Sequence, residues 1–227
     1  MKSFIKTKGQ LWVLVITAVC ITITAVIFQQ SFLRILPLYI SLFVVTLQSK
    51  VNRYSNLLGA ANSVLYAFVY LHYKLYASMA SALFVSFPFQ IITFIRWNKN
   101  SWNKSTVLRK LSCKQRVGII FVFFALLLVL LGILSLTDAN HAFLDSSHFI
   151  LGVMTSVLTV FAYVEYTWFM ILNVSVSTAL YVSMVCSGTP EQVPYLVFSV
   201  YSLVCAYIGC KKANALYKLQ QSEQCEK

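Results

Sequence analysis

Long apolar stretches alternate with short polar connections along almost the whole chain. Most of the stretches contain the roughly 20 apolar residues that an α-helix needs to cross the hydrocarbon core of a bilayer. The candidate spans are Leu11–Phe28, Phe32–Gln48, Asn56–Tyr73, Leu75–Arg96, Val117–Leu136, Phe149–Tyr163, Trp168–Cys186 and Tyr195–Cys210. The pattern predicts an all-α polytopic membrane protein with eight spans.

The first stretch needs a separate decision, because a basic start followed by an apolar run is also typical of a signal peptide. Lys2, Lys6 and Lys8 precede the run Leu11–Phe28. This run is longer than the apolar core of a usual signal peptide, and no small-x-small cleavage site follows it. We therefore predict a retained transmembrane helix at 11–28.

Basic residues fall almost entirely in every second connection. When the connections are numbered alternately from the inside, 16 of the 18 Lys and Arg residues lie in the inside set, and only Arg34 and Lys74 lie outside. The outside set also holds Asp138, Asp145 and Glu191. This distribution follows the positive-inside rule and predicts that both termini are cytoplasmic. An odd number of spans would place one basic terminus outside, so the charges favour eight.

Composition supports a membrane protein and limits its partners. Hydrophobic residues make up 59% of the chain, charged residues make up 11%, and the mean hydropathy is +0.76. The net charge of +12 is best explained by contact with anionic lipid at the helix ends. The longest connection, from Trp97 to Arg116, has no pattern of a folded core. We therefore expect a lipid bilayer as the surroundings and no nucleic acid as a partner.

No residue pattern indicates catalysis or a metal site. Asp145, Ser146, Ser147 and His148 combine acid, nucleophile and base, but adjacent residues entering a helix are better explained as a helix cap than as converging catalytic groups. The six cysteines have no metal or redox spacing, and the sequence has no glycine-rich phosphate loop. We predict no enzymatic activity, no bound metal and no cofactor.

The spans group into two compact sets of three. After the extra helix at 11–28, the predicted parts are a three-helix unit at 32–97, a linker helix at 117–136, a second three-helix unit at 147–212 and a cytoplasmic tail at 213–227. A single span between two units of three leaves both units in the same orientation. Parallel repeats of this kind surround a midplane substrate site in one class of transporter.

Polar residues within the predicted spans are the candidates for such a site, because polar groups are costly in lipid and usually face the protein interior. The amides Asn62, Gln90 and Asn173 are the most costly; they can bind a solute or hold helices together. Hydroxyl groups such as Ser177 can bond to their own helix backbone, which favours a packing role. The aromatic residues beside them, which can stack on a flat ligand or pack within the bundle, are Tyr66, Tyr163, Phe169 and Tyr181.

Two segments resemble the PnuC family of vitamin transporters. The first begins at Tyr54-Ser55-Asn56-Leu57-Leu58-Gly59-Ala60-Ala61-Asn62, continues through Leu65-Tyr66 and Lys74-Leu75-Tyr76-Ala77-Ser78, and ends at Trp97. The second runs from Phe143-Leu144-Asp145-Ser146 to Tyr163-Val164-Glu165. The resemblance covers about Tyr54 to Lys212. It implies a SWEET-like fold of three plus one plus three helices, preceded here by the extra helix at 11–28.

The resemblance also implies a function. Members of this family carry a water-soluble B-vitamin or a nucleoside-like solute by facilitated diffusion, and a cytoplasmic kinase often captures the solute. The implied protein is a homo-oligomer, expected to be a trimer, in the bacterial cytoplasmic membrane. A polytopic sensor or assembly protein is the alternative that does not involve transport.

The chain departs from the nicotinamide riboside members, which carry two Trp three residues apart just after the Glu. Those positions fall on Thr167 and Met170 here, with Trp168 and Phe169 out of register. The departure favours thiamine, a flat cation that aromatic and amide side chains can hold. Nicotinamide riboside, riboflavin and deoxynucleosides are the alternatives. Glu165 is expected to have a structural or gating role. The predicted substrate-binding residues are Asn62, Tyr66, Gln90, Tyr163, Trp168, Phe169, Asn173 and Ser177.

Overall fold

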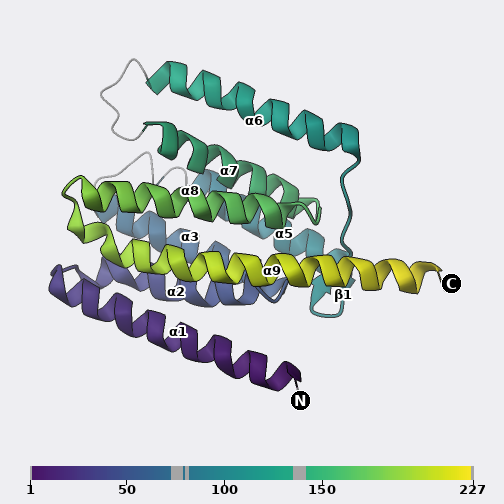
Figure 1. The fold of residues 1–227 in the computed structure, drawn as a ribbon, viewed down its shortest axis with the longest axis horizontal. Helices are drawn as coiled ribbons and strands as arrows, with labels where there is room; N and C mark the ends of the chain where they lie inside the picture. The colour runs from purple at the N-terminus through teal and green to yellow at the C-terminus, as the bar shows by residue number, and fades with distance from the viewer. Residues whose placement is uncertain (1, 73–78, 80–81, 135–141, 226–227) are drawn as a thin grey trace.

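Helices make up almost all of the computed structural model, which describes residues 2–72, 79, 82–134 and 142–225 (Figure 1). The long helices are α1 (Lys2–Ile27), α2 (Phe32–Gln48), α3 (Tyr54–His72), α5 (Phe87–Lys99), α6 (Cys113–Leu134), α7 (Ala142–Val160), α8 (Tyr166–Cys186) and α9 (Val193–Cys225). The short elements are the π-helix η1 (Ala82–Ser86), the 3-10 helix η2 (Pro190–Gln192) and the strands β1 (Ser101–Trp102) and β2 (Ser105–Thr106). The all-α prediction is confirmed.

The described helices contain fewer strongly apolar spans than the eight that the sequence pattern predicts. Helices α1, α6, α7, α8 and α9 are long and apolar enough to cross a membrane, and α2 is a shorter apolar helix. Helix α3 is less apolar because it carries the buried residues Asn56 and Asn62. Only 13 residues form α5, and part of the predicted span Leu75–Arg96 lies outside the described residues, as do Lys74, Asp138 and the end of Val117–Leu136.

Six of the described helices close into a ring. Helix α2 packs on α3, α3 on α5, α5 on α7, α7 on α8, α8 on α9, and α9 returns to α2. Helix α1 lies outside the ring against α9 and α2, and α6 lies outside it along α7 (Figure 1). Helix α6 is apolar on all sides and largely exposed, as expected of a helix that lipid surrounds. The ring therefore provides an enclosed space for polar side chains.

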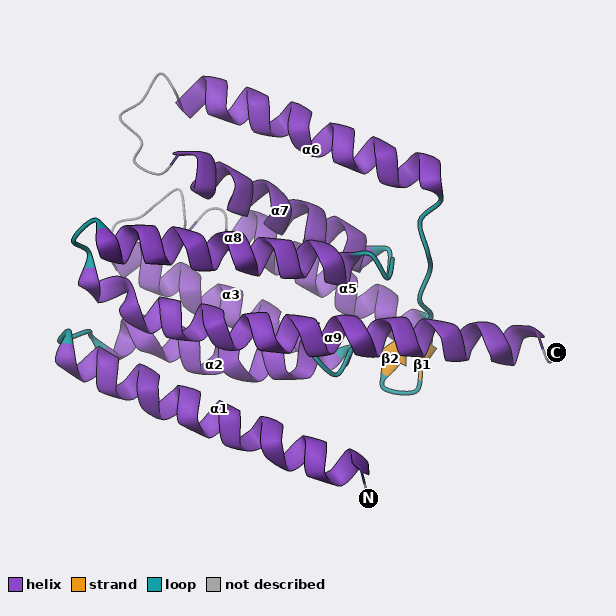
Figure 2. Cartoon of the chain, in the orientation of Figure 1, coloured by secondary structure: helices purple, strands orange, loops and turns teal. Residues whose placement is uncertain are grey.

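Both termini lie at the same end of the ring, which we name the basic end (Figure 1). It also holds the α2–α3 turn, the connection between α5 and α6 with its small β1–β2 hairpin, and the α7–α8 turn (Figure 2). Lys50 and Arg53 lie in the α2–α3 turn, Lys104, Arg109 and Lys110 lie in the α5–α6 connection, and Lys211, Lys212 and Lys218 lie in the second half of α9. The chain order and the charge pattern thus agree on one basic end and one opposite end.

A segment that we name the strap, residues 101–112, crosses the basic end and is hydrogen-bonded to the α2–α3 and α7–α8 turns. The Arg53 amide donates to the Lys104 carbonyl at 3.0 Å. The Arg109 amide donates to the Ala162 carbonyl at 2.8 Å, and the Val164 amide donates to the Arg109 carbonyl at 2.8 Å. Because these bonds use backbone groups of the α2–α3 and α7–α8 turns, the strap joins the two halves of the ring.

We predict that Gly209→Val destabilises the fold by about 1–3 kcal/mol, the usual cost of overpacking. A Cβ at position 209 of α9 would lie 3.3 Å from the Ser49 Cα and 3.5 Å from the Gln48 carbonyl oxygen. A valine would therefore separate α9 from the end of α2. Thermal unfolding in detergent measures the effect.

The matched control is Gly118→Val on α6, because a Cβ at that position meets nothing within 4 Å. Equal melting temperatures for the two variants would contradict the close approach of α9 and α2.

Candidate functional site

Two cavities lie within the ring of helices. The distal cavity, about 600 Å³ and away from the basic end, is lined by residues that include Ser63, Tyr66, Tyr70, Asp145, His148 and Asn173. The proximal cavity, about 140 Å³ and nearer the basic end, is lined by residues that include Asn56, Gln90, Thr155, Thr159, Tyr166 and Met170. The polar residues of α3, α5, α7 and α8 therefore converge in the middle of the ring.

A narrow wall separates the two cavities. Phe89 and Ser156 line both of them. Gln90, which lines the proximal cavity, donates from Nε2 to the Ser63 hydroxyl at 3.1 Å, and Ser63 lines the distal cavity. Gly59 makes room for this amide, because a Cβ there would overlap Gln90 Oε1. Phe89 and Gln90 therefore belong to the partition between the two cavities.

Several buried polar atoms around the cavities have no hydrogen-bond partner among the described residues. Asn173 Oδ1 and His148 Nδ1 belong to the distal cavity, and Asn56 Nδ2 belongs to the proximal cavity. A buried polar atom without a partner costs about 1–3 kcal/mol. Such atoms can bond to water or to a polar solute in the cavity.

The hydroxyl groups around the cavities behave differently from the amides. Thr155 donates to the Leu151 carbonyl at 2.7 Å, and Ser156 donates to the Gly152 carbonyl at 2.9 Å. Thr159 likewise donates to the Thr155 carbonyl at 2.6 Å. The expected bonding of these hydroxyls to their own helix backbone is confirmed. Their oxygens keep lone pairs for a solute, while the helix satisfies the donor.

Three of the sequence-predicted site residues line the cavities. Tyr66 and Asn173 face the distal cavity from α3 and α8, and Gln90 faces the proximal cavity from α5. Asn62 is buried elsewhere and donates from Nδ2 to the Ser41 hydroxyl at 2.8 Å, so it joins α3 to α2. Ser177 is buried on α8 and is not among the residues that line either cavity.

The other three predicted residues lie away from the cavities. Trp168 is 57% exposed, and with Phe169 it lines a groove outside the ring between α6, α8 and α9. Tyr163 lies in the α7–α8 turn and packs against the core cluster at the basic end. Helix geometry explains why Trp168 lies outside the ring while Tyr166 lines the proximal cavity, because the two residues are about 200° apart around α8. Met170, at one of the two positions that correspond to the family's Trp pair, does line the proximal cavity.

Sequence reasoning missed the contribution of α7 to the distal cavity. Asp145 and His148 line it, followed on the same helix by Gly152 and Ser156. The available signal was the spacing of three or four residues, which places these positions on one helical face. Asp145, treated as a helix cap in the sequence, is the one carboxylate among the described residues that line this cavity. It gives the entrance a negative charge.

The passage is closed at the basic end. Val51, Trp97 and Tyr166 line the bottom of the proximal cavity and belong to one core cluster. The Trp97 and Tyr166 rings meet edge to face with centroids 6.1 Å apart. Trp97 Nε1 also donates to the Thr159 carbonyl at 2.7 Å, which fixes the indole across the opening. This cluster therefore closes the proximal cavity at the basic end.

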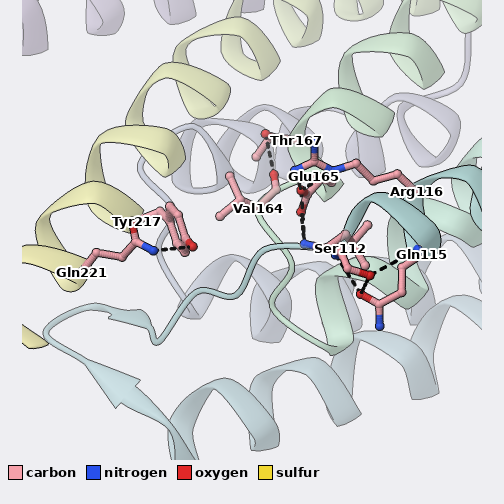
Figure 3. Close-up of polar contacts among 9 residues, drawn as sticks. Ser112, Gln115, Arg116, Val164, Glu165, Thr167, Tyr217 and Gln221 are labelled. Atoms are coloured by element: carbon pink, nitrogen blue, oxygen red, sulfur yellow. Dashed lines mark hydrogen bonds and ion pairs between the residues drawn. The ribbon is translucent and has the colours of Figure 1, made fainter.

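Glu165 ties the strap and α6 to the start of α8 (Figure 3). Its carboxylate accepts from the Leu111 amide, at 3.2 Å to each oxygen, and from Arg116 Nη2 at 2.8 Å. The Glu165 side chain is 13% exposed and that of Arg116 is 41% exposed. These contacts give Glu165 a structural role just outside the closed end of the passage.

Comparison with known proteins agrees with this architecture. The model of the nicotinamide mononucleotide transporter family matches residues 31–212. A solved structure described as the vitamin B3 transporter PnuC is similar over 94% of this chain and 92% of that chain, with a TM-score of 0.76 and 21% sequence identity. At this identity the similarity shows the fold. No curated protein sequence matches the chain.

Proposed function

This chain belongs to the nicotinamide mononucleotide transporter family, and from that premise we propose that it carries a vitamin B3 nucleoside, nicotinamide riboside, by facilitated diffusion. The family is one of multi-pass membrane transporters, not of enzymes. The resemblance to PnuC proteins noted in the sequence is confirmed by the family match and by the fold. Thiamine, which the sequence analysis favours, becomes the competing substrate.

The observation that carries the proposal is the chemistry of the distal cavity. Its volume of about 600 Å³ lies within the roughly 300–1,000 Å³ that is usual for small-molecule sites. Tyr66 and Tyr70, whose rings stack at 5.8 Å between centroids, offer aromatic surface. Asn173 Oδ1 and His148 Nδ1 have no hydrogen-bond partner in the described part of the chain. A flat heteroaromatic solute with amide and hydroxyl groups fits this combination.

The charged and aromatic groups of the distal cavity favour a cationic solute. Nicotinamide riboside carries a positive charge on its pyridinium ring, and tyrosine faces attract cations. The Asp145 carboxylate at the cavity entrance adds Coulomb attraction for the same charge. A cationic nucleoside is therefore favoured over a neutral or anionic one.

Thiamine shares the cationic charge and the aromatic character, and one observation favours it. Thr167 is fully buried, with its hydroxyl donating to the Val164 carbonyl at 2.8 Å, and Met170 lines the proximal cavity. These two positions correspond to the Trp pair of nicotinamide riboside members. With Thr167 and Met170 in place of two tryptophans, these positions offer no aromatic ring on which a substrate can stack. This difference favours a substrate other than nicotinamide riboside.

We place the distal cavity at the external side of the bacterial cytoplasmic membrane and the basic end at the cytoplasmic side. The support is the positive-inside distribution of charge over the connections. The carrier then accepts solute from outside and releases it when the cluster of Val51, Trp97 and Tyr166 opens. A homotrimer and a capturing cytoplasmic kinase stay predictions from the resemblance.

Thiol labelling tests this orientation with two natural cysteines. Cys113 at the start of α6 and Cys186 at the end of α8 are both exposed, at opposite ends of the bundle. With the other cysteines changed to serine, a membrane-impermeant maleimide should label Cys186 in intact cells. Cys113 should react only after permeabilisation, and the opposite result would reverse the topology.

The substrate is tested by uptake into liposomes that contain the purified protein. We expect labelled nicotinamide riboside to equilibrate without a sodium or proton gradient, because the proposed carrier uses no coupled energy. Binding titrations with nicotinamide riboside, thiamine, riboflavin and a deoxynucleoside then rank the solutes, and protein-free liposomes serve as the control.

Tight thiamine binding that nicotinamide riboside does not displace would assign the protein to thiamine. Uptake that disappears when an ion gradient is removed would contradict facilitated diffusion.

We predict that Asn173→Ala weakens binding of the transported solute by roughly 5- to 150-fold, the effect of about 1–3 kcal/mol from a lost hydrogen bond in a dry site. Trp168→Ala, on the opposite face of the same helix, should leave the affinity unchanged. Isothermal titration of both variants measures the difference. Loss of affinity in Trp168→Ala alone would place the solute in the groove between α6, α8 and α9 instead of inside the ring.

A further inference from the structure

A groove outside the ring, at the basic end, has no part in the proposed passage. It lies between the start of α6, the start of α8 and the last third of α9, with a volume of about 510 Å³. A second groove of about 500 Å³ continues along α8 and α9. The two share Trp168, Asn214 and Lys218. We name their combined surface the outer groove.

The outer groove exists because α6 makes few contacts with α9. Along its length α6 packs on α7. Near its start, the Arg116–Glu165 ion pair and the strap hold it beside α8. Ile119 and Ile120 then face the groove from α6, opposite Phe169 on α8. The gap between the helices is thus apolar and opens toward the surroundings of the bundle.

The rim of the groove is strongly basic. Lys110, Lys211 and Lys218 are all exposed around it. None of the three has an ion-pair partner among the residues that the structure describes, where Arg116–Glu165 is the ion pair found. Glu165 already accepts bonds from Arg116 and Leu111. Lys110 and Lys218 therefore leave an uncompensated positive charge on the part of the groove that they share, while Lys211, whose Nζ lies 4.4 Å from the Tyr207 ring centroid, adds charge on the adjoining part.

The position of Trp168 indicates at which depth in the bilayer these lysines lie. The side chain is 57% exposed, it lines both parts of the groove, and exposed tryptophans of membrane proteins gather at the bilayer interface. Lysines beside it lie at the level of lipid head groups, with the apolar residues of α6 next to them. An amphiphile with an anionic head and an apolar tail matches this arrangement of lysines beside apolar side chains.

We propose that the outer groove binds an anionic phospholipid of the leaflet at the basic end. Its phosphate lies between Lys110 and Lys218, and an acyl chain lies along Ile119, Ile120 and Phe169. Basic pockets between transmembrane helices on the cytoplasmic side are known to select anionic head groups. A soluble phosphate compound would use the lysines but not the apolar floor. The bound lipid bridges α6 and α9, two helices that otherwise meet little.

Native mass spectrometry of the full-length protein, delipidated in detergent, tests the proposal with added phosphatidylglycerol or phosphatidylcholine. The wild type should retain phosphatidylglycerol in preference to phosphatidylcholine. The double variant Lys110→Gln and Lys218→Gln should retain about 30-fold less phosphatidylglycerol, as expected from the loss of two lysines near a lipid phosphate. The matched control, Lys99→Gln with Lys104→Gln, removes the same charge at the same end but outside the groove.

A second variant tests the apolar half. Ile120→Trp fills the groove from α6 and should reduce retention of phosphatidylglycerol while all basic residues stay. Circular dichroism and gel filtration establish that each variant is folded, and Lys218→Gln alone replaces the double variant if that protein fails to fold.

Three results would overturn the proposal. Equal retention by the groove variant and its control would show that only overall charge matters. Equal retention of phosphatidylcholine would show that the head group is not recognised. Full displacement of the lipid by millimolar inorganic phosphate, with Ile120→Trp unchanged, would assign the lysines to a soluble anion.

Discussion

The structure depends on one constraint: polar groups within a bilayer must find their partners inside the protein, because lipid offers none. Closing α2, α3, α5, α7, α8 and α9 into a ring meets this constraint. Asn62 finds Ser41 on the neighbouring helix, and Gln90 finds Ser63. Asn173 and His148 each keep a polar atom without a partner among the residues that the structure describes, and both face the distal cavity. The same enclosure that satisfies most polar groups thus leaves a few available for a solute.

The constraint also explains why the two ends of the ring differ. At the basic end, the strap satisfies its own backbone groups by bonding to the α2–α3 and α7–α8 turns. Its apolar residues Leu108 and Leu111 complete the core cluster that contains Trp97 and Tyr166. Closure of the passage and attachment of the strap are therefore one packing arrangement. At the other end, Asp145 leaves the distal cavity with a charged entrance.

Helix α8 shows how one element serves two surroundings. Tyr166, Met170 and Asn173 face the cavities of the ring, whereas Trp168 faces outward beside Lys218. The low amphipathic character of α8 follows from this arrangement, because the inner face is only moderately polar and the outer face is aromatic and aliphatic. The proposed solute and the proposed lipid would therefore contact the same helix on opposite sides.

The all-α membrane architecture, the family and the presence of one basic end could be predicted from the sequence, because apolar length, charge alternation and local motifs are encoded residue by residue. The sequence also identified Asn173, Gln90 and Tyr66, since amides and aromatics within spans are unusual enough to stand out. Which candidate residues line the same cavity could be seen only in the folded protein. Asn62 bonds to Ser41 on α2, and Trp168 lines the groove outside the ring. Asp145, which the sequence analysis explained as a helix cap, lines the distal cavity. The physical reason is that a ring of helices is closed by contacts between residues far apart in the chain, and the facing of each side chain follows from how each helix is rotated within that ring.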